Sequence, residues 1–179
     1  TNSSIQIRTS LLRLLPEFQL ILFEQPRIDR TTRCLVAAPH PDDAEIAAYG
    51  LYSSTHSAVV TITGGESGGT NYSRFLRDDL ARHRLKSRLR VWDSLAVPLF
   101  GNVHPENVAN LGYFDGSLEQ MYRDPSCHVT STATRFDAVQ DQRTSLSGNL
   151  LRSDPAPCWS SLVADLSHSI DNFRPDWIV

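Results

Sequence analysis

Cysteine is scarce in this chain and follows no pairing pattern. Three cysteines, Cys34, Cys127 and Cys158, occur among 179 residues, and no two of them form a Cys-x-x-Cys motif. An odd number of scattered cysteines argues against a disulfide framework and favours a reducing compartment. We therefore expect a cytoplasmic protein.

Long apolar runs and a strong excess of either charge are also missing. No run of ~18 apolar residues is present, so no transmembrane helix is expected, and no basic segment leads into an apolar core as in a signal peptide. The net charge of −3 and the pI near 6.0 offer no general attraction to nucleic acid. With 40% hydrophobic residues, the chain is suited to one domain with a substantial core.

A short polar run follows the apolar stretch Cys34–Ala38. It reads His-Pro-Asp-Asp from His40 to Asp43, and a helix-like stretch comes next. Pro41 fixes its own φ and biases His40 toward an extended conformation, so the turn is stiff and its side chains are aimed. The carboxyl end of a buried strand is the place where open α/β sheets bind their ligands.

The residue types in this run indicate a metal site. Neutral imidazole and carboxylate are ordinary zinc ligands, so His40 and Asp43 are predicted to bind one zinc ion. Asp42 lies between them and is suited to the role of general base, because a metal acidifies its bound water and a carboxylate can take the proton. The alternative is that the two aspartates merely cap the following helix. Capping accounts for an aspartate but not for the preceding His-Pro.

Apolar periodicity predicts the fold class. Strands are expected near 33–38, 58–63, 96–100 and 175–179, and helices near 43–54, 73–95 and 159–173. This alternation predicts an α/β fold with a Rossmann-like parallel sheet flanked by helices. The polar stretch 119–157 is long for a plain connection, so we expect either an excursion on the substrate side or a mobile surface loop.

The motifs resemble a known family. The run from Leu35 to Ile46 closely resembles the opening motif of the LmbE-like, or PIG-L-type, de-N-acetylases. Later segments resemble that family in the same order, namely 58–69, 84–97, 111–116 and 173–179. The resemblance spans about residues 31 to 179. It implies a hydrolase that uses Zn²⁺ to remove the acetyl group from an N-acetylated sugar or glycoconjugate, such as an N-acetylglucosaminyl lipid.

The resemblance also implies a role for individual residues. His40 and Asp43 would hold the zinc, and Asp42 would be the catalytic base. Arg84 matches the substrate-binding arginine of the family's helix, and Asp115 matches the aspartate of its Gly-Tyr-x-Asp turn, which holds sugar hydroxyls.

The family motif that carries the third metal ligand has no match in the sequence. In the family, the strand that resembles Trp177–Val179 leads to a His-Pro-Asp-His-like motif carrying that ligand and a second catalytic histidine. The sequence stops at Val179, so the resemblance implies a missing C-terminal part, either lost or present as a separate chain. Within the sequence, His128 and His168 are the alternatives for a third ligand, since catalytic zinc usually has three protein ligands.

Residues 1–30 are expected to form an N-terminal extension of the deacetylase domain at 31–179. The stretch Ile5–Leu15 is amphipathic, and the apolar stretch Phe18–Phe23 follows Pro16. We expect a helix and a strand packed on the domain, because amphipathic faces usually meet a core. The alternative is binding to a membrane surface or a partner.

The glycine-rich loop Gly64–Gly69 supports a rival interpretation, a non-catalytic nucleotide-binding module with a phosphate near a helix N-terminus. No Gly-Lys-Ser/Thr follows the loop, and Glu66 would repel a phosphate. A sugar-binding relative that has lost its metal is the other alternative, but the intact His-Pro-Asp-Asp run argues against such a loss. The sequence therefore predicts a zinc-dependent de-N-acetylase, or the N-terminal portion of one.

Overall fold

The computed structural model describes residue 10 and residues 28–68, 72–74 and 76–179. In this part of the chain, five strands form one sheet in the order β4-β3-β2-β1-β5. The strands are β1 (Arg33–Ala38), β2 (His56–Thr63), β3 (Val108–Tyr113), β4 (Thr144–Ser145) and β5 (Trp177–Ile178). The helices are α1 (Asp43–Tyr52), α2 (Asp79–Phe100), α3 (Leu118–Arg123) and α4 (Trp159–Phe173).

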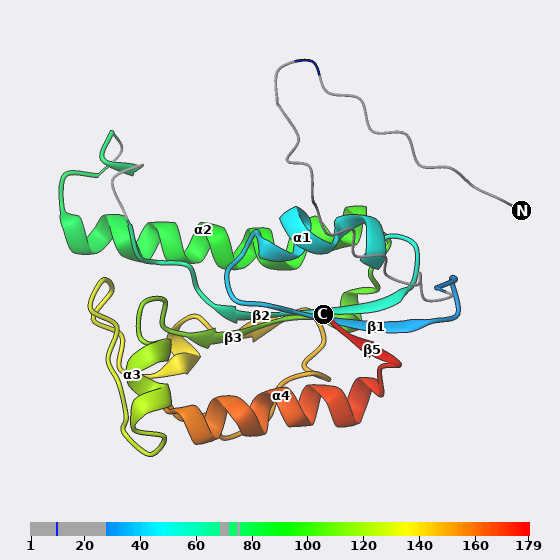
Figure 1. The fold of residues 1–179 in the computed structure, drawn as a ribbon. Helices are drawn as coiled ribbons and strands as arrows, with labels where there is room; N and C mark the ends of the chain where they lie inside the picture. Colours follow the sequence, from blue (N-terminus) through cyan, green and yellow to red (C-terminus); the bar gives the residue numbers. More distant parts are fainter. Residues whose placement is uncertain (1–9, 11–27, 69–71, 75) are drawn as a thin grey trace, which may run out of the picture.

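The sheet is mostly parallel and is covered on both faces. β1 pairs in parallel with β2 and β5, and β2 pairs in parallel with β3, while the short β4 runs antiparallel at the edge. α1 and α2 cover one face, and α3 and α4 lie on the other (Figure 1). The predicted α/β class with a flanked parallel sheet is thus confirmed, and the arrangement is compatible with a Rossmann-like fold.

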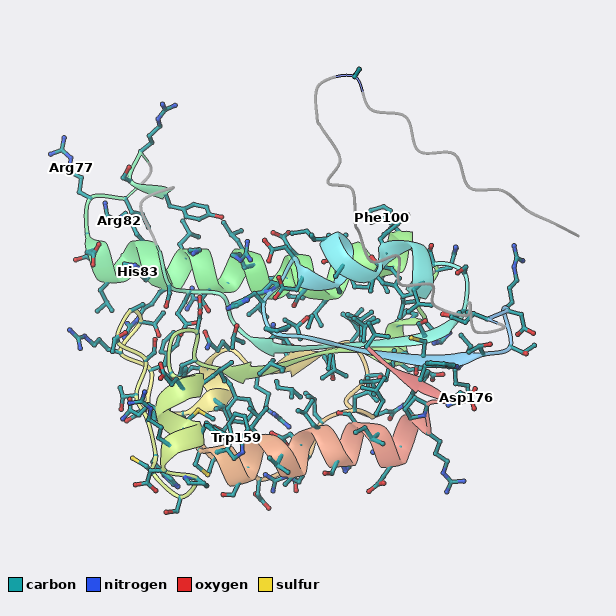
Figure 2. The ribbon with its side chains drawn as sticks, in the orientation of Figure 1. Arg77, Arg82, His83, Phe100, Trp159 and Asp176 are labelled. Carbon is teal, nitrogen blue, oxygen red and sulfur yellow. The ribbon has the colours of Figure 1, made fainter. Side chains whose placement is uncertain are left out.

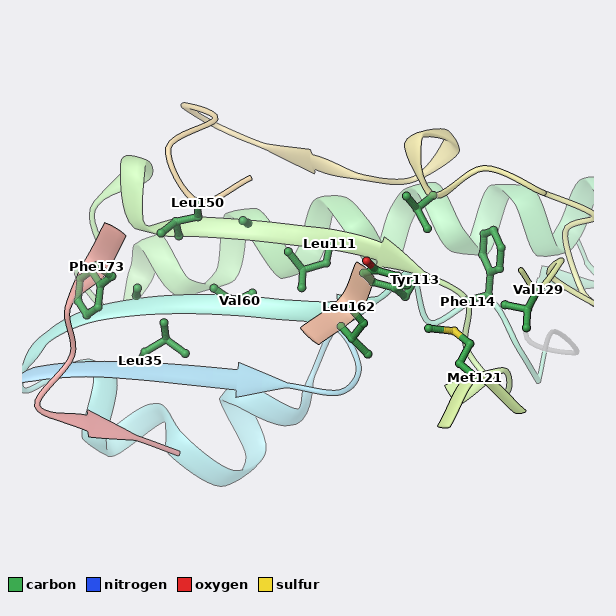
Figure 3. Packing of buried hydrophobic residues seen from close by; sticks show 13 residues of the cluster. Leu35, Val60, Leu111, Tyr113, Phe114, Met121, Val129, Leu150, Leu162 and Phe173 are labelled. Carbon is green, nitrogen blue, oxygen red and sulfur yellow. The ribbon is translucent and has the colours of Figure 1, made fainter. Parts of the chain in front are cut away.

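Alternate residues of the strands supply two separate cores. Cys34 and Val36 of β1 pack with α1 and α2, whereas Leu35 points to the opposite face. There it meets Leu162 and Phe173 of α4 in the larger cluster (Figure 3). Strands that are buried on both faces have continuous apolar sequences. For this reason the strands predicted near 33–38 and 58–63 are confirmed as β1 and β2.

One predicted strand is wrong. Residues 96–100 are the last part of α2, which runs to Phe100, and the third parallel strand is β3 at Val108–Tyr113. Leu95 and Pro98 are buried at a helical spacing of three, so the apolar run faces the sheet as a helix. Pro98 is tolerated near the end of α2, where the backbone N–H that proline lacks costs the helix one hydrogen bond. The helix also begins at Asp79, later than the predicted residue 73. Asp78 caps this end, because its side chain accepts the N–H of Ala81 at 2.6 Å.

The polar stretch 119–157 packs on the sheet and is not a loose surface loop. It contributes Val129, Val139 and Leu150 to the larger core. Asp165 of α4, which is fully buried, anchors it by accepting hydrogen bonds from Arg143 and Arg152. Buried carboxylates require such partners.

None of the helices in the described residues is long and apolar enough to cross a membrane. The helix and strand expected within residues 5–23 lie outside the described part of the chain.

Candidate metal and catalytic site

Three loops meet at the carboxyl edge of the sheet. They follow β1 at 39–42, β2 at 64–68 and β3 at 114–117. The loops are tied together directly, because the backbone N–H and the hydroxyl of Thr63 both donate to the carbonyl of Pro39, at 3.1 and 2.8 Å. The N–H of Gly64 donates to the carbonyl of Tyr113 at 3.1 Å. The site residues expected after β1 and after β3 are therefore brought to one place.

The imidazole of His40 lies between two carboxylates. Its Nδ1 is 3.0 Å from Oδ2 of Asp43, and its Nε2 is 3.2 Å from Oδ1 of Asp115. The same Asp43 oxygen accepts the backbone N–H of His40 at 2.9 Å, which fixes the tight turn. The side chains of His40 and Asp43 are 42% and 38% exposed, so both remain accessible to an ion.

The spacing of His40 and Asp43 fits two positions of a zinc site. Two ligand atoms at zinc bond lengths in a tetrahedral arrangement lie about 3.3 Å apart, close to the 3.0 Å between Nδ1 and Oδ2. Zinc on Nδ1 would leave the proton on Nε2, which could donate to Asp115. Metal-ligating histidines commonly donate their other ring N–H to a carboxylate in this way. Among the described residues, no three His, Cys, Asp or Glu side chains are placed to hold one metal together.

Asp42 does not cap α1 with its side chain. It occupies the N-cap position, but its carboxylate makes no capping hydrogen bond and instead accepts the Arg90 guanidinium at 2.8 Å. The capping interpretation is therefore wrong for Asp42. Its side chain is 47% exposed beside the His40 and Asp43 pair, where a base could meet water.

Arg90 reaches Asp42 through a gap left by Gly65. A Cβ on Gly65 would lie 2.8 Å from Arg90 Nε and 2.8 Å from Pro41 Cδ. Gly65 also has a φ of +61°, in the left-handed region that favours glycine. The glycine-rich loop after β2 thus provides space for an arginine.

A buried layer supports Asp115. Glu66 is fully buried, and its Oε1 accepts the N–H of Asp115 at 3.1 Å and the Ser131 hydroxyl at 2.9 Å. Its Oε2 has no hydrogen-bond partner among the described residues. Burial raises the pKa of Glu66, which favours the neutral acid. Lys86 donates to the Ser67 carbonyl, and burial lowers its pKa.

Arg84 is not brought into contact with His40. Its Nε donates to the Thr134 carbonyl at 3.0 Å, and its guanidinium lies over the Phe136 ring. Its substrate-binding role stays a prediction. Two other basic side chains of α2 contact the loops of the site, because Arg90 donates to Asp42 and Lys86 donates to the Ser67 carbonyl. Lys86 and Arg90 are four residues apart and share a helix face, whereas Arg84 is separated from Lys86 by about 160° around the helix axis.

The other histidines do not complete the site. His128 is exposed, and His168 lies on α4, where its Nε2 is 2.8 Å from Nδ2 of Asn172. α4 covers a sheet face rather than the loop edge (Figure 1).

Comparisons with known proteins add no family assignment. Neither family models, nor curated proteins, nor solved structures give a match to this chain. The resemblance to the LmbE-like enzymes therefore stays a prediction from the motifs, and the interpretation of the site depends on the contacts around His40.

Proposed function

We propose that this chain carries the metal-binding and base residues of a zinc-dependent hydrolase that removes the acetyl group from an N-acetylated amino sugar or sugar conjugate. The observation that carries the proposal is the pairing of His40 Nδ1 with Asp43 Oδ2 at 3.0 Å, directly after a parallel strand, with the carboxylate of Asp42 beside it. Such a set of donors is typical of zinc hydrolases.

His40, Asp42 and Asp43 would have different roles in the reaction. When bound to His40 and Asp43, zinc would supply a Lewis acid and an acidified water. Asp42 would take a proton from the attacking water as the water oxygen bonds to the acetamide carbon. Asp42 would then give that proton to the nitrogen as the C–N bond breaks. The products are acetate and a free amine, so one water is consumed.

Two neighbours would keep the donors in position. Arg90 holds one oxygen of Asp42 at 2.8 Å, which leaves the other oxygen free for water. Asp115 would accept the Nε2 proton of His40, so that Nδ1 would be the unprotonated nitrogen and could serve as the metal donor. Asp115 is also predicted to contact sugar hydroxyls through its remaining acceptor capacity.

Arg84 is proposed to contact the substrate from the neighbouring segment. It binds Thr134, whose own N–H donates to the hydroxyl of Ser131, the residue that contacts Glu66. This chain of contacts links Arg84 to the layer beneath Asp115.

The third zinc ligand is proposed to come from outside the described residues, from a further segment or a separate chain. All six histidines are among the described residues, in which no third His, Cys, Asp or Glu side chain joins His40 and Asp43 around one ion. A cytoplasmic location also remains a proposal. It is consistent with the three free cysteines, two of which are buried.

The test is acetate release from a panel of N-acetylated amino sugars, with zinc present, by the full-length product of the gene. Asp42→Asn keeps the shape of the site but removes the proton acceptor, so turnover should fall ~10²-fold or more, while zinc remains bound. Asp171→Asn, at an exposed position on α4, is the matched control. An unchanged rate in Asp42→Asn, or wild-type protein inactive on every N-acetylated sugar, would contradict the proposal.

A further inference from the structure

The outer face of α1 and α2 is apolar. On α2, exposed apolar side chains follow a helical spacing, with Leu89 42%, Trp92 61%, Leu99 37% and Phe100 81% exposed. On the neighbouring α1, Ile46 is 79% exposed and Tyr49 45%. We call this set the outer apolar face, and Phe100 projects from it on the side away from the sheet (Figure 2).

The other side of the molecule offers a contrast. The exposed residues of α4 are mostly polar, as expected for a helix that covers a sheet and meets water. They are Ser160, Val163, Ser167, Asp171 and Asn172. Large contiguous apolar patches on a soluble domain usually mark a surface that something covers. The outer apolar face is therefore the better candidate for a covered surface than α4.

The continuous described chain starts near the segments that follow α1 and α2. Arg30, which lies just before β1, lines one cavity together with Asn102 and His104, which directly follow α2. Ile28, the first residue of the continuous described chain, is two residues before Arg30, which lies near the Phe100 end of α2. Arg30 therefore places the start of the continuous described chain near the ends of α1 and α2.

The length and pattern of the segment that precedes Ile28 match the face. From Phe100 to Leu89 the face extends about 17 Å along α2 at the helical rise per residue. The stretch Ile5–Phe23 would extend about 28 Å as a helix, and longer if part of it is extended. The residues between Phe23 and Ile28 can span about 17 Å. Within Ile5–Phe23, apolar residues recur on one side of the predicted helix and fill most of the stretch after Pro16.

We propose that residues Ile5–Phe23 of the same chain cover the outer apolar face of α1 and α2. Attachment within one chain favours this occupant over a separate molecule, because a short connection gives a high effective concentration. The proposal specifies the surface to which the amphipathic segment binds, and it does not depend on the proposed hydrolase activity.

Hydroxyl-radical footprinting of the full 179-residue chain tests the proposal. Oxidation of Trp92 and Phe100 is measured in the native protein and, as a reference, in the same protein unfolded in urea. We expect several-fold protection of both residues and weaker protection of Val163 on α4. In the variant Leu11→Asp with Leu15→Asp the protection of Trp92 should be lost, because two buried carboxylates would oppose docking. Ser3→Asp with Ser4→Asp adds the same charge outside the segment and should leave Trp92 protected.

Photo-crosslinking keeps the test independent of variants that fail to fold. Benzoylphenylalanine at position 92 of the otherwise unchanged chain should crosslink to residues 5–23 of the same molecule, and the same group at position 163 should not. Three results would overturn the proposal. The first is oxidation of Trp92 at the rate of an exposed residue. The second is protection or crosslinking that disappears on dilution, because it would then come from a second copy of the chain. The third is protection that requires added lipid vesicles.

Discussion

Gly65→Ala is expected to lower the free energy of unfolding by about 2–4 kcal/mol. Forcing an alanine into the left-handed region costs about 1–2 kcal/mol, and Gly65 has a φ of +61°. The new Cβ would also lie 2.8 Å from both Arg90 Nε and Pro41 Cδ. Overpacking of that kind adds about 1–2 kcal/mol, because the proline ring cannot move away and the arginine can do so only by leaving Asp42.

Two other glycines separate these contributions. Gly148 has a φ of +81° but no atom within 4 Å of the position that a Cβ would take, so Gly148→Ala should show the backbone cost alone. Gly112 has a φ of +76° and would place a Cβ 2.4 Å from the Val139 carbonyl oxygen, so Gly112→Ala should be the most destabilising. Urea unfolding followed by circular dichroism measures all three. If Gly65→Ala and Gly148→Ala cost the same, the close packing of Gly65 against Arg90 and Pro41 is refuted.

Two further predictions concern buried carboxyl groups. Asp165→Asn should cost about 3–5 kcal/mol in urea unfolding, since it leaves buried Arg143 without its charged partner, while exposed Asp171→Asn should stay within about 0.5 kcal/mol; equal effects would contradict the buried network. Burial raises the pKa of Glu66 in the folded state, so the unfolded state loses this proton at a lower pH. The free energy of unfolding therefore falls as the pH rises from the unfolded pKa, about 4.3, through the higher folded pKa. Glu66→Gln removes this loss and should be more stable than wild type at neutral pH, with the advantage shrinking toward pH 4. A difference in the free energy of unfolding that does not vary with pH would refute the reasoning.

The sequence predicted the elements whose signals are local. The buried run of β1 and the stiff His-Pro-Asp-Asp turn placed His40 and Asp43 correctly at the strand end, because strand, proline and turn all act within a few residues. The strand predicted at 96–100 was wrong because a short apolar run does not distinguish a strand from a helix that packs on a sheet.

The support of the site could not be predicted because it depends on tertiary contacts. Arg90 is 48 residues from Asp42 in the chain, and only the folded arrangement shows that Gly65 leaves it a path. Glu66 was interpreted as a charge that would repel phosphate, whereas it lies buried beneath Asp115. The helical spacing of Lys86 and Arg90 was the available signal, but an exposed basic helix face has the same pattern.

Zinc titration of the protein tests the central claim most directly. Isothermal titration of wild type, His40→Ala, Asp43→Ala and Arg84→Ala would compare zinc stoichiometry and affinity. We expect one zinc site per chain that is weakened at least ~10-fold by the loss of either ligand and is unchanged in Arg84→Ala. With two protein ligands from the described residues, wild-type binding should be weak enough for zinc to be removed by dialysis. Absence of zinc binding in the wild type, or wild-type affinity in His40→Ala and Asp43→Ala, would contradict the assignment of this site as a metal centre.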